Sequence, residues 1–331
     1  MGEKELSAIE TELYDRQIRL WGIESQEKLR AANVLLIGIR GLGSEIAKDI
    51  LLSGINSLTI LDNGIVTKEE QLVNFLLTPD LLGKNIAKSV LAKAQALNPL
   101  VKLTADSDSV DSKDEDFFKQ FTIVISTKLG TDEIIKISAW CRKSNVKFIS
   151  GDVFGMFGYT VSDFQDHEYY EDRVKLPKKR RHDEKNPKTE MVTVKVQARI
   201  KYPDLSTVVK RSKTGKMKKC RNIYYYLMLV LLEFRNRHKR DPSYTKRQED
   251  LVSLKSVWAD ISKDYEVDSI MLNDEIFGLV FGEIVPICSI VGGIVVQEAI
   301  KAVSGKEVPI NNVFLLNPLT YYGKEETIGI V

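Results

Sequence analysis

The sequence has little of what several protein classes need. Its three cysteines, Cys141, Cys220 and Cys288, are too few and too scattered for a disulfide framework or a four-thiolate zinc site. The apolar stretch Ile284–Val296 is interrupted by proline, serine and glycine, and it is shorter than the roughly 18–20 residues of a membrane span. The N-terminus has acids where a secretory signal needs a basic and then an apolar run. We therefore expect a soluble intracellular protein, without a membrane segment or a metal site.

An excess of one charge is also missing, and histidine is scarce. Lysine and arginine total 48 against 46 acids, a formal net charge of +2, so no global positive field indicates nucleic-acid binding. The three histidines, His167, His182 and His238, lie in charged segments. We expect each to be exposed to solvent rather than catalytic.

Strand and helix signals alternate in the first half of the chain. Val34–Gly38 and Ser57–Asp62 are typical of buried parallel strands, and Leu42–Ser53 between them has the apolar stripe of a helix. Further elements are predicted at 85–97 and 132–144 (helices) and at 122–126 and 146–150 (strands). This order predicts an α/β fold, a Rossmann-like doubly wound sheet that binds ligands at the carboxyl ends of its strands.

Composition divides the chain into three segments. Residues 1–165 carry the α/β pattern, residues 166–270 are rich in charge, and residues 271–331 return to low charge. We expect the first and last segments to form one domain, interrupted by a charged, partly helical insertion. In these two later segments we predict helices at 221–237, 245–264 and 285–303 and strands at 191–200, 312–316 and 327–331.

A glycine-rich loop joins the first predicted strand to the first predicted helix. Gly38, Gly41 and Gly43 lie where a nucleotide phosphate would meet the helix N-terminus, and Asp62 follows at nearly the roughly 20-residue separation of a ribose-binding acid. However, Arg40 stands where the dinucleotide fingerprint has its second glycine. The Arg40 side chain either blocks a phosphate or supplies charge to one. The spacing leaves open direct nucleotide binding and a purely structural tight turn.

Four motifs together resemble the activating enzymes of ubiquitin-like modifiers: Tyr14–Gly22, Gly38–Ile50, Gly151–Tyr159 and Pro286–Lys306. Within this family, length and motifs are most similar to the smaller, non-catalytic subunits of heterodimeric SUMO-activating enzymes. The resemblance implies a pseudo-adenylation domain that pairs with a larger catalytic subunit. The pair would adenylate the C-terminus of SUMO with ATP and transfer SUMO to a cysteine of the larger subunit, which also recruits the SUMO-conjugating enzyme. A nuclear location is implied as well, and the basic run at 175–181 is similar to an import signal.

The nucleotide-binding positions of the family are degenerate in this chain. By resemblance, an adenylating half has a glycine at the place of Arg40 and a second acid at the place of Gly64. It also has an asparagine, an arginine and a phosphate-facing lysine at the places where this chain has Glu70, Val73 and Ile86. Such a cleft would repel or ignore a triphosphate. We therefore expect ATP and Mg²⁺ to be bound by the partner subunit and not by this chain.

Arg16 is the exception among these positions. The resemblance implies that the arginine of the Tyr-x-Arg-Gln motif crosses to ATP phosphates held by the partner, a task that suits a planar guanidinium. The residues alone, without the family motif, favour a solvated or capping role for Arg16 and Arg19. Cys220 has basic neighbours but no accompanying histidine or aspartate, and we expect it not to be a nucleophile.

Three alternatives remain open at this point. One is a homodimeric ThiF-like adenylyltransferase that needs no second kind of subunit, and another is an NAD-dependent oxidoreductase, which Gly38–Gly43 and Asp62 permit. The third is a pure scaffold whose Arg16 never reaches ATP.

Overall fold

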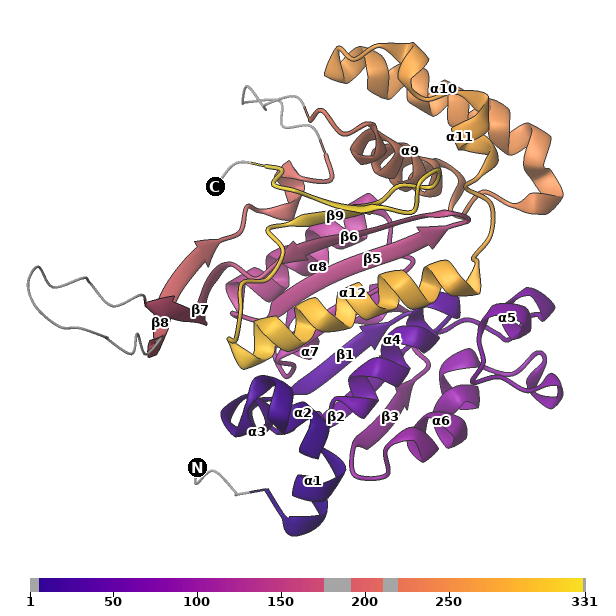
Figure 1. Ribbon diagram of the computed structural model, residues 1–331. Helices are drawn as coiled ribbons and strands as arrows, with labels where there is room; N and C mark the ends of the chain where they lie inside the picture. The colour runs from indigo at the N-terminus through magenta and orange to yellow at the C-terminus, as the bar shows by residue number, and fades with distance from the viewer. Residues whose placement is uncertain (1–5, 176–191, 211–219, 330–331) are drawn as a thin grey trace, which may run out of the picture.

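A mostly parallel sheet forms the centre of the protein. The computed structural model describes residues 6–175, 192–210 and 220–329. The strands of the sheet are β1 Asn33–Ile37, β2 Ser57–Leu61, β3 Lys102–Asp106, β4 Ile123–Ser126, β5 Lys147–Phe154, β6 Phe157–Asp163, β9 Val313–Leu316 and β10 Gly323–Glu326. They lie in the order β10-β9-β6-β5-β4-β1-β2-β3 (Figure 1), with β1 to β5 parallel and β6, β9 and β10 antiparallel. The predicted Rossmann-like α/β fold is confirmed.

Helices cover both faces of this sheet. The α-helices of the described residues are α1 Ala8–Leu13, α2 Asp15–Trp21, α3 Ile23–Arg30, α4 Gly41–Leu52, α5 Lys68–Val73, α6 Ile86–Leu97, α7 Glu115–Phe118, α8 Thr131–Lys143, α9 Ile223–His238, α10 Arg247–Tyr265, α11 Asp274–Gly278 and α12 Val285–Ser304. Short 3₁₀ turns lie at η1 Pro79–Leu81, η2 Val110–Ser112, η3 Leu205–Thr207, η4 Tyr244–Lys246 and η5 Ser269–Met271.

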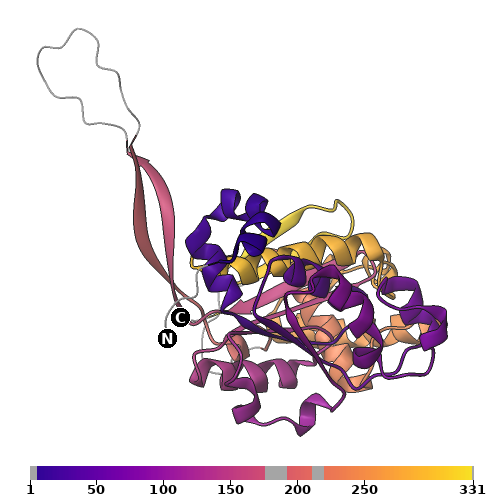
Figure 2. The same cartoon turned by 90° about the horizontal axis from the view of Figure 1, so that it is seen from below.

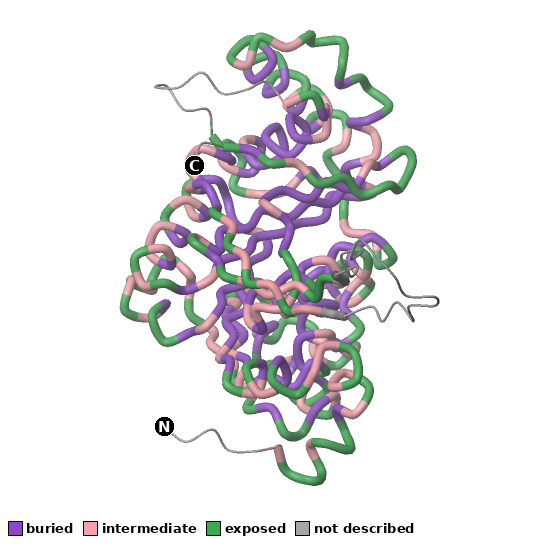
Figure 3. The backbone as a smooth tube through the Cα atoms, turned by 60° about the vertical axis from the view of Figure 1, so that its left-hand side comes forward, coloured by how far each residue is buried: buried purple, intermediate pink, exposed green. Residues whose placement is uncertain are grey.

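Side chains along the central strands point alternately to the two faces of the sheet, and this creates two apolar cores. Val34 and Leu36 of β1 pack with apolar residues of α4, α6 and α12. Leu35 and Ile37 point to the opposite face and pack with residues of α8 and α9. The central strands β1, β4, β5 and β6 are consequently buried on both sides, as is typical of parallel sheets, and Figure 3 shows buried backbone in the middle of the protein.

Helix α12 is a core helix. By length and composition alone it could cross a membrane, because the helix runs for 20 residues through the interruptions that made Ile284–Val296 look too short. More than half of its apolar window is buried inside the protein. It crosses α4 closely at Gly292, where a Cβ atom would stand 3.0 Å from the Cβ atom of Glu45. Gly292 thus permits α12 and α4 to approach each other closely.

The charged segment 166–270 contributes both surface and core. Its hairpin of β7 (Asp166–Lys175) and β8 (Val192–Lys201) projects from the body of the protein (Figure 2). Helix α9 instead packs into the core against residues of the sheet, and α10 packs on α9. The predicted helices at 221–237 and 245–264 and the predicted strand at 191–200 are confirmed. Residues 176–181 of the basic run lie outside the described residues.

The last predicted strand, at 327–331, is wrong for residues 327–329, and residues 330 and 331 lie outside the described residues. The strand at this edge is β10, which pairs antiparallel with β9 and ends at Glu326. The chain then leaves the sheet because the backbone N–H of Ile328 donates to the Oδ1 atom of Asn312, and the Ile328 side chain turns into the core.

The expected exposure of the histidines holds for only one of the two described. His238 is exposed at the end of α9. His167, at the start of β7, is only 5% exposed and lies beside Phe164 and Tyr169. Burial is the main cause that lowers the pKa of His167, and together with the charge of Lys147 it brings this pKa to about 4. His182 lies outside the described residues.

Candidate functional site

The glycine loop lies at the switch point of the sheet. β1 pairs with β2 on one side and with β4 on the other, so a crevice forms at the carboxyl ends of β1 and β4. Gly38 follows β1, Lys128 lies just beyond β4, and α4 begins at Gly41. This is the place where open α/β sheets bind their ligands.

A carboxylate of the chain itself already binds the start of α4. The backbone N–H of Gly41 donates to the Oε2 atom of Glu283 at 3.1 Å. A Cβ atom at position 41 would stand 2.9 Å from that oxygen and 3.1 Å from the Cγ2 atom of Val73. The missing side chain of Gly41 therefore leaves room for the side chain of Glu283, which is 8% exposed.

Five charged side chains, the crevice cluster, meet behind this contact: Lys128, Asp152, Arg235, Asp241 and Glu283. The Lys128 Nζ atom lies 2.9 Å from Asp241, 3.4 Å from Glu283 and 3.7 Å from Asp152. Arg235 of α9 binds Asp152 and Asp241, each at 2.6 Å. The cluster ties β4, β5 and α9 to the residues that precede α12.

The charges of this cluster compensate one another. Burial alone would raise the pKa of Asp241, but Arg235 and Lys128 outweigh burial and hold it below its ordinary value. Burial would likewise lower the pKa of Lys128, but the three surrounding carboxylates raise it. Because three acids face two cations, the cluster offers no spare positive charge to a phosphate.

The remaining predicted residues of the loop are also bound internally. The Nη1 atom of Arg40 lies 2.7 Å from the Oε1 atom of Glu70, so its charge is paired. The Oδ2 atom of Asp62 accepts from the N–H of Ile39 at 2.9 Å, and its Oδ1 atom accepts from the N–H of Gly64 at 2.8 Å. Asp62 therefore holds the loop together. These residues, with the filled crevice, do not fit the phosphates and ribose of a nucleotide.

Arg16 lies elsewhere, on α2. Its side chain is exposed and makes no hydrogen bond or ion pair with any other described residue. Arg19 on the same helix pairs with Asp15 at 2.9 Å. The helix itself is anchored, because Gln17 donates to the carbonyl oxygen of Leu52 at 2.8 Å. The structure thus separates the predicted residues into two groups. The residues of the glycine loop have partners within the chain, whereas the Arg16 side chain has none among the described residues.

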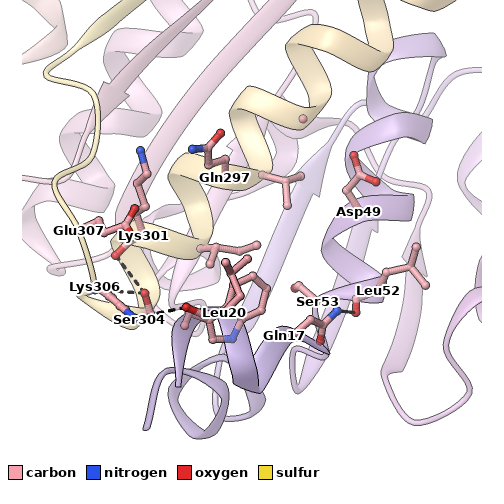
Figure 4. A pocket seen from close by; sticks show the side chains of 14 residues that line it. Gln17, Leu20, Asp49, Leu52, Ser53, Gln297, Lys301, Ser304, Lys306 and Glu307 are labelled. Atoms are coloured by element: carbon pink, nitrogen blue, oxygen red, sulfur yellow. Dashed lines mark hydrogen bonds between the residues drawn. The ribbon is translucent and has the colours of Figure 1, made fainter. Parts of the chain in front are cut away.

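A cavity of about 470 Å³ opens between α2, α4 and α12 (Figure 4). Figure 4 shows Gln17 and Leu20 entering from α2, Asp49 and Leu52 from α4, and Gln297 from α12. Large apolar side chains on these helices and on α1 remain exposed: Leu13, Leu20, Leu52 and Ile290.

The thiols are not activated by their surroundings. Cys141 and Cys288 are buried, and burial raises the pKa of Cys141 to about 12. Cys220 is half-buried, and burial raises its pKa above the ordinary value as well. A reactive thiol needs the opposite shift.

Comparison with known proteins assigns the family. The model of the ThiF family matches residues 14–327, and the chain therefore belongs to this family. The crystal structure of SeMet PaaA superposes with a TM-score of 0.57 at 16% identity, covering 100% of this chain and 77% of that one, which shows the fold.

Relatives of nearly the same length narrow this assignment. SUMO-activating enzyme subunit 1 of Xenopus laevis is 36% identical over 343 residues, covering 99% of each chain. The Homo sapiens subunit 1 is 36% identical over 334 residues (98% of this chain, 96% of the relative), and that of Danio rerio over 325 residues (95% and 93%). Within the ThiF family, the chain groups with the SUMO-activating enzyme subunits.

Sequence reasoning missed the crevice cluster. None of its members was predicted as a site residue, although Asp152 lies in the motif Gly151–Tyr159 and Lys128 lies just beyond a predicted strand. The available signal was the position of charged residues at the carboxyl ends of apolar strands, where side chains converge.

Proposed function

We propose that this chain is the non-catalytic subunit of a heterodimeric SUMO-activating enzyme. In this proposal the larger partner binds Mg²⁺ and ATP, adenylates the C-terminus of SUMO and carries the cysteine that receives it. This chain completes the partner's ATP site and has no nucleotide site of its own. The names of its full-length relatives support the pathway, and the geometry of the crevice supports the division of labour.

The filled crevice is the observation that carries the proposal. A triphosphate needs unpaired cations and free backbone donors. In this chain the Gly41 N–H, the Lys128 ammonium and the Arg40 guanidinium all have carboxylate partners. A nucleotide would have to break these contacts and displace Glu283 before it gained any of its own.

Arg16 is the group that this chain lends to its partner. It is an exposed cation without an internal partner among the described residues, on a helix that Gln17 fixes to the body. A guanidinium that reaches the partner's ATP would bind phosphate oxygens with parallel donors and offset the charge that develops on them during adenylation.

The surface around the cavity is the face that we assign to the partner. Exposed Leu20, Leu52 and Ile290 lie on three helices that surround or border the cavity of Figure 4. Contiguous exposed apolar side chains mark protein interaction sites. Because α2 is part of this face, the same contact would bring Arg16 to the partner.

The two alternative enzyme functions need side chains and backbone groups that already have partners within this chain. A homodimeric adenylyltransferase would need Mg²⁺ and ATP in the crevice that Glu283 fills. An NAD-dependent oxidoreductase would need Asp62 for a ribose, but both of its carboxylate oxygens accept backbone N–H groups. Neither alternative gains support from a described residue.

Replacing Arg16 tests the proposal. In the reconstituted heterodimer, Arg16→Ala should slow ATP–pyrophosphate exchange dependent on SUMO by about two to four orders of magnitude, because transition-state charge loses its partner. The heterodimer should remain assembled on gel filtration. Arg19→Ala is the matched control, since Arg19 is exposed on the same helix but paired with Asp15. A near-normal rate for Arg16→Ala, or an equal loss in the control, contradicts the role.

A further inference from the structure

We infer that Tyr14 and Gln17 are positioning residues for Arg16. Together with Gln26 and Asn98 they form a set of side chains, the helix clamp, that fastens α2 to the end of α4. The clamp holds the backbone of α2 where the Arg16 guanidinium can reach the partner. The inference deepens the proposed function and rests on it in one respect, that Arg16 acts on the partner's ATP.

The clamp uses the carbonyl groups that end α4. The last carbonyl groups of a helix have no partner within the helix. At the end of α4, three consecutive carbonyl oxygens each accept a side-chain amide: Leu51 from Asn98 at 2.8 Å, Leu52 from Gln17 at 2.8 Å (Figure 4) and Ser53 from Gln26 at 2.9 Å. The three amides come from α2, from α3 and from the residue that follows α6. The last turn of α4 therefore binds segments that are separate in the sequence.

Arg16 lies between two members of the clamp. Tyr14, two residues before it, is 4% exposed, and its hydroxyl oxygen accepts a hydrogen bond from the Asn98 amide at 2.9 Å. Gln17 follows Arg16 directly. The backbone of α2 is thus held on both sides of Arg16, whose own side chain stays exposed. Helix α2 has only seven residues, which are too few for a helix to be stable alone, so its position depends on such contacts.

A glycine after α4 makes room for the clamp. Gly54 has φ of +78°, a conformation in which a residue with a side chain is strained. A Cβ atom at this position would stand 2.5 Å from the Cζ atom of Tyr14 and 2.8 Å from the Nε2 atom of Gln26. The Gln26 side chain is fully buried, and its Oε1 atom accepts the indole N–H of Trp21 at 3.0 Å. Gln26 thereby joins the last residue of α2 to the same turn.

An arginine that acts on another subunit needs a fixed starting point. Guanidinium donors bind phosphate oxygens in a planar, parallel arrangement, so the contact depends on direction as well as on distance. A displacement of about 1 Å in a catalytic group can cost about 10²-fold in rate. The Arg16 side chain makes no hydrogen bond or ion pair with the described residues that would orient it. The backbone of α2 therefore sets the position of the guanidinium, and the clamp sets the position of α2.

Gln17→Met in the reconstituted heterodimer tests the inference, because methionine keeps the length of the side chain without the amide donor. With this chain in saturating excess over the partner, the kcat of SUMO-dependent ATP–pyrophosphate exchange should fall about three- to tenfold, the effect of losing one hydrogen bond. In an Arg16→Ala background the same change should alter the rate by less than about twofold, since no guanidinium remains to be positioned. Gln120→Met is the matched control: the Gln120 amide also donates to a carbonyl oxygen, that of Phe117 at 2.8 Å, but lies outside the clamp. Its exchange rate should equal that of the wild type.

A rate for Gln17→Met within about twofold of the wild type overturns the inference, and so does an equal loss with and without Arg16, which would mean a purely structural role. Tyr14→Phe is a second variant that does not depend on the folding of the first. It removes only the hydroxyl group that accepts from Asn98, and it should slow exchange only while Arg16 is present. The proposed function fails separately, if Arg16→Ala by itself exchanges at a near-normal rate.

Discussion

The crevice cluster should contribute strongly to stability through Arg235. Its side chain is 8% exposed and binds Asp152 and Asp241, each at 2.6 Å, and it donates to the carbonyl oxygen of Leu129 at 2.8 Å. Arg235→Ala would leave three carboxylates facing Lys128 alone. Breaking a buried ion pair on one side costs about 3–5 kcal/mol, because the remaining charges stay buried and uncompensated.

This loss of unfolding free energy should be measurable as a lower melting temperature. Unfolding entropy is about 2.1 cal/mol/K per residue, or about 0.7 kcal/mol/K for a chain of this length. Arg235→Ala should therefore lower the Tm by about 4–7 °C in calorimetry of the purified chain. Arg235→Lys should recover part of the loss, because lysine restores the positive charge but not the planar set of guanidinium donors that binds two carboxylates.

Arg237→Ala is the matched control for this measurement. Arg237 lies on the same helix but is exposed, and it pairs with Glu233 and Asp260 at the surface. Surface pairs contribute about 0–1 kcal/mol, so the control should shift the Tm by less than about 2 °C. Equal shifts for the two variants would refute the reasoning that burial and shared carboxylates make Arg235 important.

Two further predictions concern a histidine and a thiol. Because the pKa of His167 falls to about 4 on folding, the unfolded chain binds more protons between about pH 4 and 6.5, and stability should rise with pH there. His167→Phe should remove up to about 2 kcal/mol of this rise in urea unfolding at pH 4.5–7, allowing for solvent screening, and an unchanged pH slope would contradict the assignment. Cys220→Ser in the heterodimer should leave SUMO thioester formation unchanged on non-reducing gels, since burial raises the thiol pKa. Loss of the thioester would instead make Cys220 the acceptor.

The parts of the fold that local pattern determines could be predicted from the sequence. The apolar run of β1 and the helical stripe of α4 fix their own secondary structure, and their order fixes a parallel sheet. β10 could not be placed, because its register depends on pairing with β9 and on the contact of Ile328 with Asn312. His167 was misjudged because its charged sequence neighbours on the hairpin hide a side chain that points toward Phe164.

The candidate site was predictable in position but not in chemistry. The glycine loop lies where the sequence placed it, yet whether Arg40 serves a phosphate or a carboxylate depends on Glu70, thirty residues away. The crevice cluster is even harder to predict from the sequence, because Lys128 and Glu283 meet only after the whole sheet has formed. No local pattern encodes such a contact.

The number of nucleotides bound by the heterodimer tests the central claim most directly. If the crevice of this chain is filled by its own charges and Arg16 serves the partner's site, equilibrium titration with Mg²⁺ and ATP should give one nucleotide per pair. The isolated chain should bind none. Two nucleotides per pair, or stoichiometric binding to this chain alone, would contradict the account.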